Sequence, residues 1–400
     1  MPSFTAYYCT PTGKKQKRLW FKELNFSHSL GCIGEGKIVV PSGKDTFAPY
    51  SRVNIYRQEE TLTNNGVFVL TDVKESLVFS FFILKIQFQT TDEGEYLTSL
   101  SGLSVDQFIL SSRVTAYREQ TANTKKSADY ADDVIKDLVR ENLTTSSGTD
   151  YDGNTITKRT ISSYLLVDTD SSSGGLVSWE GAFKNLLEEL QSIQRATIAS
   201  GGEVFFGITY QTDELLLFST KLERWGRYKP GFIFGQEMGN IRGASLTADH
   251  TREVNAVYGL WSGTGAQRNI IEADIDDSMN YNPFSRREIA VNVSRAETEE
   301  AAELAVYNEL KKRRATLKFT GQIMSTFRTP YGASGWMLGD VVTANYVFGF
   351  ETSEIFGIPV NQKRYVADVM IRRVNVRVDS NGMENITGDI ESVAVRQVGV

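Results

Sequence analysis

The chain has 400 residues, of which 40% are hydrophobic and 23% charged, so it can build about two to four globular domains with cores of their own. Its formal net charge of −6 comes without a long run of either sign, which argues against a basic nucleic-acid-binding arm. Two cysteines are too few to stabilise so long a chain by disulfide bonds. The longest apolar stretch, residues 77–84, is far shorter than the ~20 residues of a membrane-spanning helix. We therefore expect a protein that folds in reducing cytosol, without a membrane anchor or a secretory signal.

Residues 1–115 alternate strand patterns with turns rich in Gly, Pro and Asn, and they predict a first β-barrel-like domain. Within 82–88, apolar and polar residues alternate with the period of two that is typical of a half-buried strand. One face of this strand is predicted to enter the core and the other to meet water. The apolar face holds Phe82, Leu84, Ile86 and Phe88, and the polar face holds Lys85 and Gln87.

Residues 116–225 predict an inserted α+β domain. Apolar residues at helical spacing between 130 and 139 indicate a first helix, and the Ser-, Thr-, Asp- and Gly-rich stretch 144–175 favours a loop. A second helix is predicted to begin after Ser178, with Phe183 in its apolar stripe. The alternation at 204–218 indicates a β-hairpin that packs on this helix.

Residues 226–262 and 315–400 predict a second β-barrel-like domain, interrupted by an insertion at 263–314. A helix in this insertion is predicted to open with a capping box formed by Ser294 and Glu297. It ends in four consecutive cations, which suit the negative end of a helix dipole better than they indicate a phosphate-binding patch. The predicted fold class is therefore β-rich α+β, with two similar β-barrel-like domains and inserted α/β subdomains.

The two β regions share a spacing that indicates duplication. Val53 and Val341 lie in similar strand patterns, at an offset of 288 residues (341 − 53 = 288). The hairpin pattern at 82–100 is echoed at 374–390, with an offset of 290 between Phe88 and Val378 and of 289 between Leu97 and Ile386. Residue identity across these pairs is poor. Two unrelated β domains remain the alternative interpretation.

The residues offer no catalytic or metal-binding pattern. Neither His28 nor His250 lies in a recognisable arrangement with a nucleophile, and the two cysteines lack the second pair that a structural zinc site needs. The acidic clusters at 150–154 and 274–277 lack the Gly and Glu positions of a calcium-binding EF-hand loop, and the glycine motifs of nucleotide sites are missing. We therefore predict a protein that is not an enzyme, with no catalytic residue, cofactor or metal.

Several short patterns follow one another along the chain, at 101–103, 109–114, 131–136, 185–187, 202–206, 254–259, 287–288 and 338–342. In this order they resemble the hub proteins at the tail tip or baseplate of tailed bacteriophages, especially the siphophage hub-like minor tail proteins. The family landmarks in the last three patterns are Asn255, Gly259, Glu288, Gly339 and Asp340. The resemblance covers nearly the whole chain, although each pattern alone is weak.

The resemblance implies a structural virion protein of the tail tip or baseplate, assembled in the host cytoplasm. It implies a homotrimer in which two similar barrels per chain form a ring, matching a sixfold tail tube to a threefold spike or fibre. The implied partners are further copies of the chain, a distal tail or tail-tube protein, a spike or fibre protein, a tape-measure protein, and DNA that passes through the channel without sequence-specific binding. The segments 144–175 and 345–363 depart from simpler members as longer loops.

Two other functions compete with the hub. A tail-associated cell-wall hydrolase would need a catalytic domain of roughly 100 residues beyond the hub core, and the chain ends near that core. A host carbohydrate-binding tail protein would expose clustered aromatic residues, and the candidates are Trp225, Tyr228, Phe232 and Phe234. We expect these aromatic residues instead to pack in the second barrel.

The strand pattern at 372–378 supplies the candidate functional side chains. Its valines share one face, which should enter the barrel core, whereas Arg373, Asn375 and Arg377 share the other. Arg373 and Arg377 are therefore predicted to meet water, to border the DNA channel or to contact a neighbouring subunit.

Overall fold

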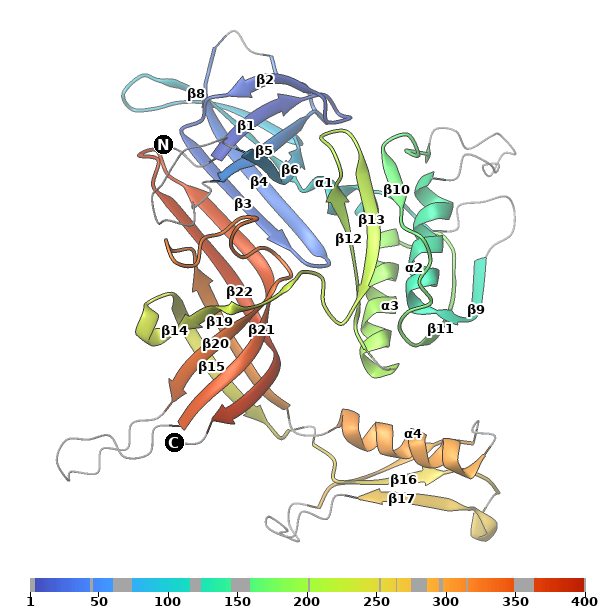
Figure 1. The fold of residues 1–400 in the computed structure, drawn as a ribbon. Helices are drawn as coiled ribbons and strands as arrows, with labels where there is room; N and C mark the ends of the chain where they lie inside the picture. Colours follow the sequence, from blue (N-terminus) through green and yellow to red (C-terminus); the bar gives the residue numbers. More distant parts are fainter. Residues whose placement is uncertain are drawn as a thin grey trace, which may run out of the picture. The chain divides into compact units, whose positions relative to one another are not determined.

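The computed structural model divides the chain into two compact units (Figure 1). The first comprises Met1–Ala244 and Gly321–Val400, and the second comprises Ser245–Thr320. The described residues are 4–43, 46–59, 74–115, 124–144, 159–200, 202–251, 253–263, 265–274, 286–294, 298–313, 316–348 and 363–398.

The first β region consists of two sheets that pack face to face. A four-stranded sheet in the order β2-β1-β5-β6 lies against strands of a larger sheet, and Phe26 of β3 stacks on Phe79 of β6 with 4.6 Å between the ring centroids. The elements are β1 (Phe4–Cys9), β2 (Lys15–Leu19), β3 (Glu23–Ser29), β4 (Cys32–Pro41), β5 (Arg52–Glu59), β6 (Lys74–Phe82), β7 (Lys85–Thr90), β8 (Tyr96–Leu103) and α1 (Val105–Ser111).

The prediction of one half-buried strand over 82–88 is wrong. β6 ends at Phe82 and β7 begins at Lys85. Between them the Ile83 amide bonds the Ser51 carbonyl beside the small sheet, and the Leu84 amide bonds a carbonyl of β8, so the chain crosses from one sheet to the other. Ile83 is buried, whereas Phe88 in β7 is 74% exposed. Apolar and polar residues do alternate here, but the predicted core residues after Phe82 lie in or next to β7, where they are exposed or half-buried.

The inserted α+β region packs two helices on a small sheet in the order β10-β13-β12. Its elements are β9 (Thr124–Tyr130), α2 (Ala131–Val139), a π-helical turn (Arg140–Thr144), β10 (Leu165–Val167), β11 (Leu176–Gly181), α3 (Leu186–Ser200), β12 (Val204–Tyr210) and β13 (Leu216–Leu222). The predicted first helix and the hairpin are confirmed. The predicted start of the second helix is wrong, because Ser178 lies in β11, paired with β9, and Phe183 is exposed.

Part of the stretch predicted to be a loop is tied firmly to α2. The Asp132 carboxylate accepts hydrogen bonds from the Ser171 and Ser173 amides and from the Lys136 ammonium, which lies 3.0 Å away. Burial opposes ionisation of Asp132, but these hydrogen bonds outweigh it and lower the pKa of the carboxyl to about 2. Residues 168–175 are therefore an anchored segment, while 145–158 lie outside the described residues.

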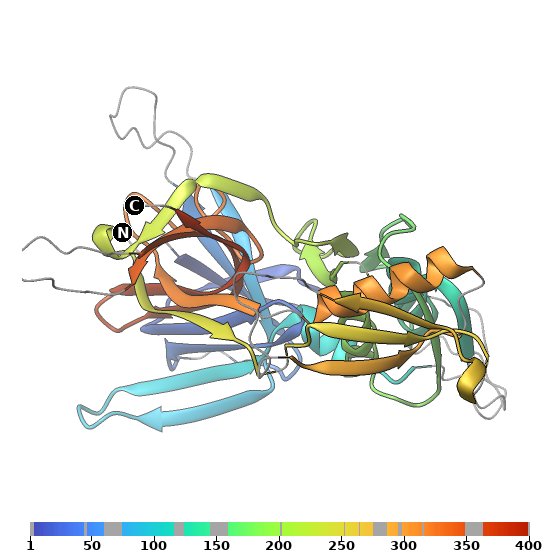
Figure 2. The same ribbon diagram turned by 90° about the horizontal axis from the view of Figure 1, so that it is seen from below.

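The second β region completes the larger sheet, whose hydrogen-bonded path runs β15-β19-β22-β21-β3-β4-β8-β7. β14 and β20 branch from β21 beside this path, and Figure 2 shows these C-terminal strands curving around a common interior. The path through the described strands ends at β15 and β7, so it does not close into a barrel. The elements are β14 (Tyr228–Gly235), a 3-10 turn (Gln236–Met238), β15 (Ile241–Asp249), β19 (Thr316–Met324), β20 (Val341–Phe348), β21 (Lys363–Val378) and β22 (Glu384–Val398).

The second unit is a three-stranded sheet in the order β17-β16-β18, covered by helix α4. Its elements are β16 (Ala256–Leu260), a 3-10 turn (Gly265–Gln267), β17 (Ile270–Asp274), β18 (Glu288–Asn292) and α4 (Glu299–Lys312). The predicted capping residue Ser294 precedes the helix, and Glu297 lies outside the described residues; the first helical amide bond runs from Ala302 to the Thr298 carbonyl. None of the helices in the described ranges is long and apolar enough to cross a membrane.

Candidate functional site

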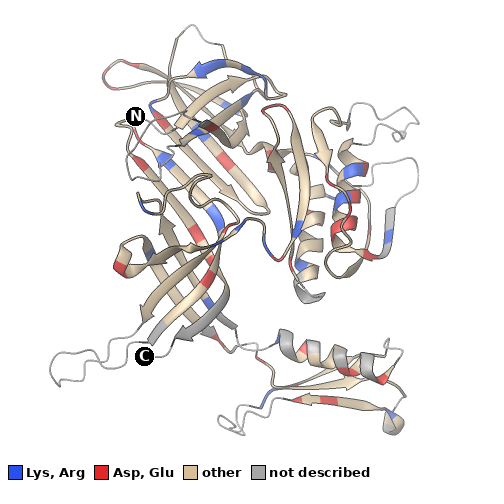
Figure 3. Cartoon of the chain, viewed as in Figure 1, with Lys and Arg blue, Asp and Glu red and all other residues tan. Residues whose placement is uncertain are grey.

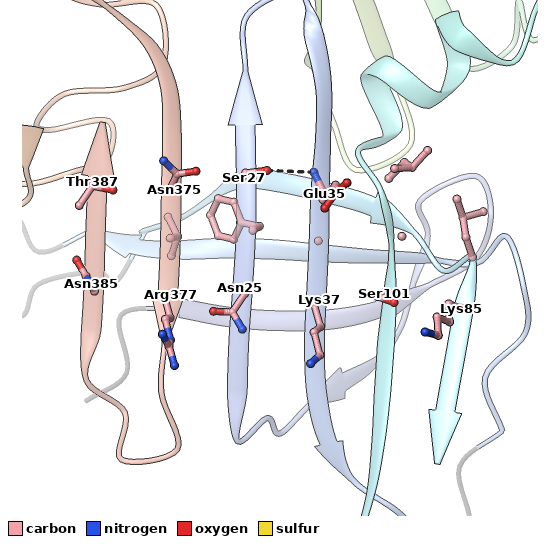
Figure 4. A pocket seen from close by; sticks show the side chains of 16 residues that line it. Asn25, Ser27, Glu35, Lys37, Lys85, Ser101, Asn375, Arg377, Asn385 and Thr387 are labelled. Carbon is pink, nitrogen blue, oxygen red and sulfur yellow. Dashed lines mark hydrogen bonds between the residues drawn. The ribbon is translucent and has the colours of Figure 1, made fainter. Parts of the chain in front are cut away.

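A polar face runs across six strands of the larger sheet (Figure 4). The strand register places one residue from each strand in a single row: Asn385, Arg377, Asn25, Lys37, Ser101 and Lys85. All six side chains are exposed or half-buried. We call this set the polar row.

The polar row follows from strict alternation in each strand. In β21 the side chains of Val374, Val376 and Val378 point to the opposite face and are 0%, 2% and 2% exposed. Leu24 in β3 and Ile38 in β4 are likewise fully buried beside polar neighbours. The prediction that the valine face of 372–378 enters the core is therefore confirmed.

The polar row forms part of a groove of about 750 Å³. A second line of side chains, from Thr387 through Asn375 and Ser27 to Glu35, runs parallel to the row. Hydrogen bonds between these groups are sparse: Figure 4 shows the Glu35 amide bonded to the Ser27 hydroxyl at 3.4 Å.

Charge in the groove is dilute and mostly positive. Three cations, Arg377, Lys37 and Lys85, face one carboxylate, Glu35, among amides and hydroxyls. In Figure 3 the strands of the sheet are mostly tan, with isolated blue and red segments. The groove lining contains neither histidine nor cysteine and only one carboxylate, so it offers hydrogen bonds and weak positive charge rather than a paired acid and base.

The structure places the two predicted arginines on this face. Arg377 belongs to the polar row, and Arg373 lies two same-face positions further along β21, beyond Asn375, where its Nε donates to the Ser29 hydroxyl at 2.7 Å. The sequence predicts the polar face of Lys85 but does not single out Lys37 or Asn25. Their alternation with Ile38 and Leu24 is visible in the sequence, whereas the adjacency of β3 to β21 is not.

The landmarks Gly339 and Asp340 form a structural joint between β14 and β20. The Asp340 carboxylate accepts from the Arg227 amide at 2.7 Å and from the Met337 amide at 3.0 Å, and pairs with the Lys229 ammonium at 3.0 Å. Gly339 has a φ of 82° and lies so close to Trp225 that a Cβ would meet the indole at 2.7 Å. These residues hold the second β region together rather than facing the groove.

The other three landmarks lie in the second unit. The side-chain Oδ1 of Asn255 accepts from the Arg287 backbone amide at 2.7 Å, and the Glu288 carboxylate accepts from the Tyr258 hydroxyl at 3.2 Å. A Cβ at Gly259 would lie 2.2 Å from the Val306 side chain of α4. Their contacts explain the packing of this unit and suggest no binding chemistry.

Two of the remaining candidates, His28 and Cys9, lie in packed surroundings, whereas His250 is exposed beside Glu253. His28 bonds the buried Asp106 carboxylate at 3.1 Å; burial opposes ionisation of Asp106, but the imidazole and neighbouring hydrogen bonds keep the pKa of this carboxyl below its usual value. Burial raises the pKa of the Cys9 thiol to about 12, while Cys32 is exposed. Among the described residues no cluster of His, Cys, Asp and Glu could hold a metal ion. The acidic cluster 150–154 and most of 274–277 lie outside them.

Burial divides the aromatic cluster that would suit a carbohydrate site: Phe234 is buried, Trp225 and Phe232 are half-buried, and Tyr228 is exposed. Phe234 is fully buried against Trp336, with 6.4 Å between the ring centroids, and Trp225 packs against Phe205 and its neighbours. Tyr228 is 46% exposed. These residues therefore present no continuous aromatic platform.

Comparison with known proteins places the chain among phage tail proteins. Residues 56–389 match the model of the family described as Siphovirus ReqiPepy6 Gp37-like protein. The tail protein from Neisseria meningitidis MC58 is 12% identical, with 98% of this chain and 97% of that chain aligned at a TM-score of 0.51, which shows a shared fold. No curated protein matches the sequence.

Two further solved structures align over similar lengths. The 43 kDa tail protein of prophage MuSo2 from Shewanella oneidensis is 12% identical, with 98% of each chain aligned at a TM-score of 0.47. Prophage tail protein gp18 from Listeria monocytogenes EGD-e is 13% identical, with 97% of this chain and 94% of that chain aligned at a TM-score of 0.44.

Proposed function

Because the chain belongs to the Siphovirus ReqiPepy6 Gp37-like protein family, a family of phage tail proteins, we propose that it forms a trimeric hub ring at the tail tip or baseplate. Each chain would supply two similar β domains, so that three chains present six. Such a ring can match a sixfold tail tube on one side and a threefold spike or fibre on the other, because heterologous contacts repeat around a closed axis.

The observation that carries this proposal is a repeated strand order. In the first half of the chain β3, β4, β7 and β8 are arranged as β3-β4-β8-β7, and in the second half β15, β19, β21 and β22 are arranged as β15-β19-β22-β21. In both halves the third and fourth of these strands in chain order exchange places in the sheet. The same spatial order therefore occurs twice in tandem along one sheet. This repetition supports an internal duplication of a four-stranded unit.

The turns of the two equivalent hairpins repeat the same hydrogen bonds. In each turn the first residue, Thr91 or Asp379, bonds through its amide to the carbonyl four positions later and accepts at its carbonyl from a glycine amide three positions later, at 2.9 to 3.1 Å. The glycines, Gly94 and Gly382, have φ values of 80° and 77°. The turns are 288 residues apart (379 − 91 = 288), the offset of Val53 and Val341. This alignment pairs Phe88 with Val376 instead of with Val378.

We place the polar row at the wall of the DNA channel. Isolated cations attract phosphate groups without reading bases, and the intervening amides and hydroxyls keep the total attraction low. A channel that must release DNA needs this balance, because each additional phosphate contact strengthens binding and its dependence on salt. Arg377 and Lys37 would be the main phosphate-facing groups, with Arg373 beside them.

The partners follow from the position of the ring. We propose a distal tail or tail-tube protein above it, a spike or fibre protein below it, and a tape-measure protein and DNA within the channel. The same position makes the chain a structural component of the virion rather than an enzyme. A cell-wall hydrolase and a carbohydrate-binding protein are the competing functions, and neither is favoured by the groove chemistry or by the burial of Phe234.

Light scattering coupled to size-exclusion chromatography tests the ring. A trimer of the 44.7 kDa chain, with rings visible by negative-stain microscopy, is the expected result. A stable monomer at high concentration with no ring in the images would overturn the proposal. Turnover of cell walls that is abolished by a single carboxylate substitution would favour the hydrolase instead.

A further inference from the structure

We propose that a cavity where the first β region meets the inserted α+β region binds a primary alkylammonium group. The cavity has a volume of about 230 Å³, and its lining includes residues of β3, β6, α1 and β12. Within it α1 and β12 lie side by side (Figure 1). The inference goes beyond the proposed ring and does not depend on it, because every residue involved belongs to one chain.

Three buried oxygen atoms of the lining have no hydrogen-bond partner among the described residues. They are Oδ1 of Asp106, Oε1 of Gln107 and the hydroxyl oxygen of Tyr210. Asp106 and Gln107 are only 3% and 1% exposed. A buried acceptor without a donor is unfavourable and uncommon in folded proteins. Three of them along one cavity indicate a site for a ligand that donates hydrogen bonds.

Asp106 supplies the negative charge of the site. Its Oδ2 lies 3.1 Å from Nε2 of His28. Burial opposes ionisation, but the imidazole and neighbouring hydrogen bonds keep the pKa of this carboxyl below its usual value, so it is ionised at neutral pH. In this described lining there is no other carboxylate and no lysine or arginine. The Oδ1 atom is therefore open to a cation from outside the cavity.

Tyr210 acts as a neutral acceptor. Burial, reinforced by the charge of Asp106, raises the pKa of the phenol well above its usual value, although the charge of Arg52 opposes this. Arg52 is not part of the lining: its guanidinium packs over the ring of Phe82 at 5.1 Å, and it leaves the three oxygens unpaired. The phenol thus keeps its proton, and its oxygen can still accept from a bound donor.

An ammonium group fits these oxygens better than water or a metal ion does. It has three N–H donors and no acceptor, so it can bond all three oxygens at once. Water carries no charge to offset that of Asp106. Calcium and magnesium ions take about six oxygen ligands or more, and these are usually supplied by several carboxylates. The lining supplies one carboxylate.

The apolar part of the lining suits the carbon chain of the ligand. Val78, Phe206 and Ile208 are buried and line the same cavity. Apolar walls lower the local dielectric and strengthen the attraction between an ammonium ion and Asp106. The volume is below the ~300 Å³ of the smallest typical small-molecule sites, which limits the ligand to a short alkyl chain.

A bound ammonium group would link two parts of the chain. Asp106 and Gln107 belong to α1 of the first β region, and Tyr210 belongs to β12 of the inserted region. A group that donates to all three stabilises the contact between these regions. The same chemistry comes from two sources, a free amine or a lysine side chain of another protein.

Calorimetry with the purified full-length chain at neutral pH tests the site, with n-butylammonium as the probe. Saturable binding of one ion per chain is expected, together with a higher melting temperature, because a ligand of the folded state stabilises it. The neutral analogue n-butanol should bind at least about tenfold more weakly, since it lacks the charge. Absence of saturable binding, or equal binding of n-butanol, would overturn the proposal and leave a water-filled or merely apolar cavity.

Substitutions assign the binding to this cavity. Asp106→Asn should weaken n-butylammonium at least about tenfold, and Tyr210→Phe about threefold to tenfold, because each removes an interaction with the charged donor. Tyr96→Phe is the matched control, since Tyr96 is exposed and lies outside the lining, and it should leave the affinity unchanged. Circular dichroism melts verify folding. Should Asp106→Asn not fold, Tyr210→Phe and the n-butanol comparison still decide. Wild-type affinity in Tyr210→Phe would place the bound ion elsewhere and overturn the proposal.

A third probe, N-acetyl-lysine amide, separates the two sources. Binding within about threefold of n-butylammonium would show that the cavity admits a side chain attached to a backbone, and would assign the site to a lysine of a partner protein. Binding at least about tenfold weaker would assign it to a free amine. Both readings are independent of the oligomeric state, so a failure of the ammonium site leaves the hub ring standing, and a monomeric chain leaves the ammonium site standing.

Discussion

The hairpins β7–β8 and β21–β22 are built alike but end in different surroundings. Their turns share the same hydrogen bonds, and both have apolar residues alternating along the first strand. Yet Val376, three residues before the turn of its hairpin, is 2% exposed, whereas Phe88, at the same distance from its own turn, is 74% exposed. The surroundings of the hairpins differ: β21 lies between β3 and β22 and its valine face joins the buried core, whereas β7 is flanked only by β8 among the described strands. Alternation defines two faces, and the tertiary packing decides whether either face is buried.

The largest expected effect is that a charge introduced into β21 prevents folding, whereas the same charge introduced into β7 does not. Val376→Asp places a charge without a partner in the core and should cost about 3 kcal/mol or more, enough to prevent folding. Phe88→Asp should change the unfolding free energy of the monomer by less than about 0.5 kcal/mol, because the site is exposed. Urea unfolding in dilute solution, followed by circular dichroism, measures both. Equal destabilisation would mean that β7 is buried within its own chain.

A milder pair of truncations sharpens the same contrast. Val374→Ala should cost about 2 kcal/mol, because it leaves a cavity beside fully buried neighbours. Ile86→Ala, at the equivalent half-buried position, should cost about 1 kcal/mol or less although it removes more carbon atoms. The denaturant midpoints of the two variants give the comparison. A larger loss for Ile86→Ala would contradict the exposed setting of β7.

Substitutions in the two turns should lower the unfolding free energy by more similar amounts than substitutions in the two strands. The Asp379 carboxylate accepts from the Asn381 and Met383 amides at 3.0 and 2.8 Å, whereas the Thr91 hydroxyl accepts from the Glu95 amide at 3.1 Å. Asp379→Ala should therefore cost about 1–2 kcal/mol and Thr91→Ala about 0.5–1 kcal/mol. Thermal melts of both variants test whether the two turns contribute in this order.

The smallest effect on stability is expected at the polar row. Arg373→Glu combined with Arg377→Glu should shift the unfolding free energy of the monomer by less than about 0.5 kcal/mol, because both side chains are exposed. If these residues face the channel, the trimer should remain intact at physiological salt and bind duplex DNA more weakly at low salt. Dissociation of the trimer in size-exclusion chromatography would instead assign the arginines to a subunit contact.

Elements that are determined by residues close together in the sequence are predicted correctly. The helix near residue 131, the hairpin at 204–222 and the buried valines of β21 follow from periodicity, which is a property of local backbone geometry. The second predicted helix is present as α3, but its predicted start after Ser178 is wrong for a different reason. The residues Leu176–Gly181 pair with β9, some fifty residues earlier in the chain, and this pairing overrides the local preference for a helix.

The polar row could not be predicted because its six residues come from six strands spread over the whole chain. The sequence pattern can predict that each residue lies on the polar face of an alternating strand, and it predicts this position for Arg377 and Lys85. The row exists only because β3 pairs with β21, which brings residues 25 and 377 together. The sequence by itself determined which side chains share a face of each strand and where the hairpins turn, because alternation and turn formation are local. Only the tertiary structure decided which strands are neighbours and which edge is left open, because those pairings depend on contacts between segments hundreds of residues apart.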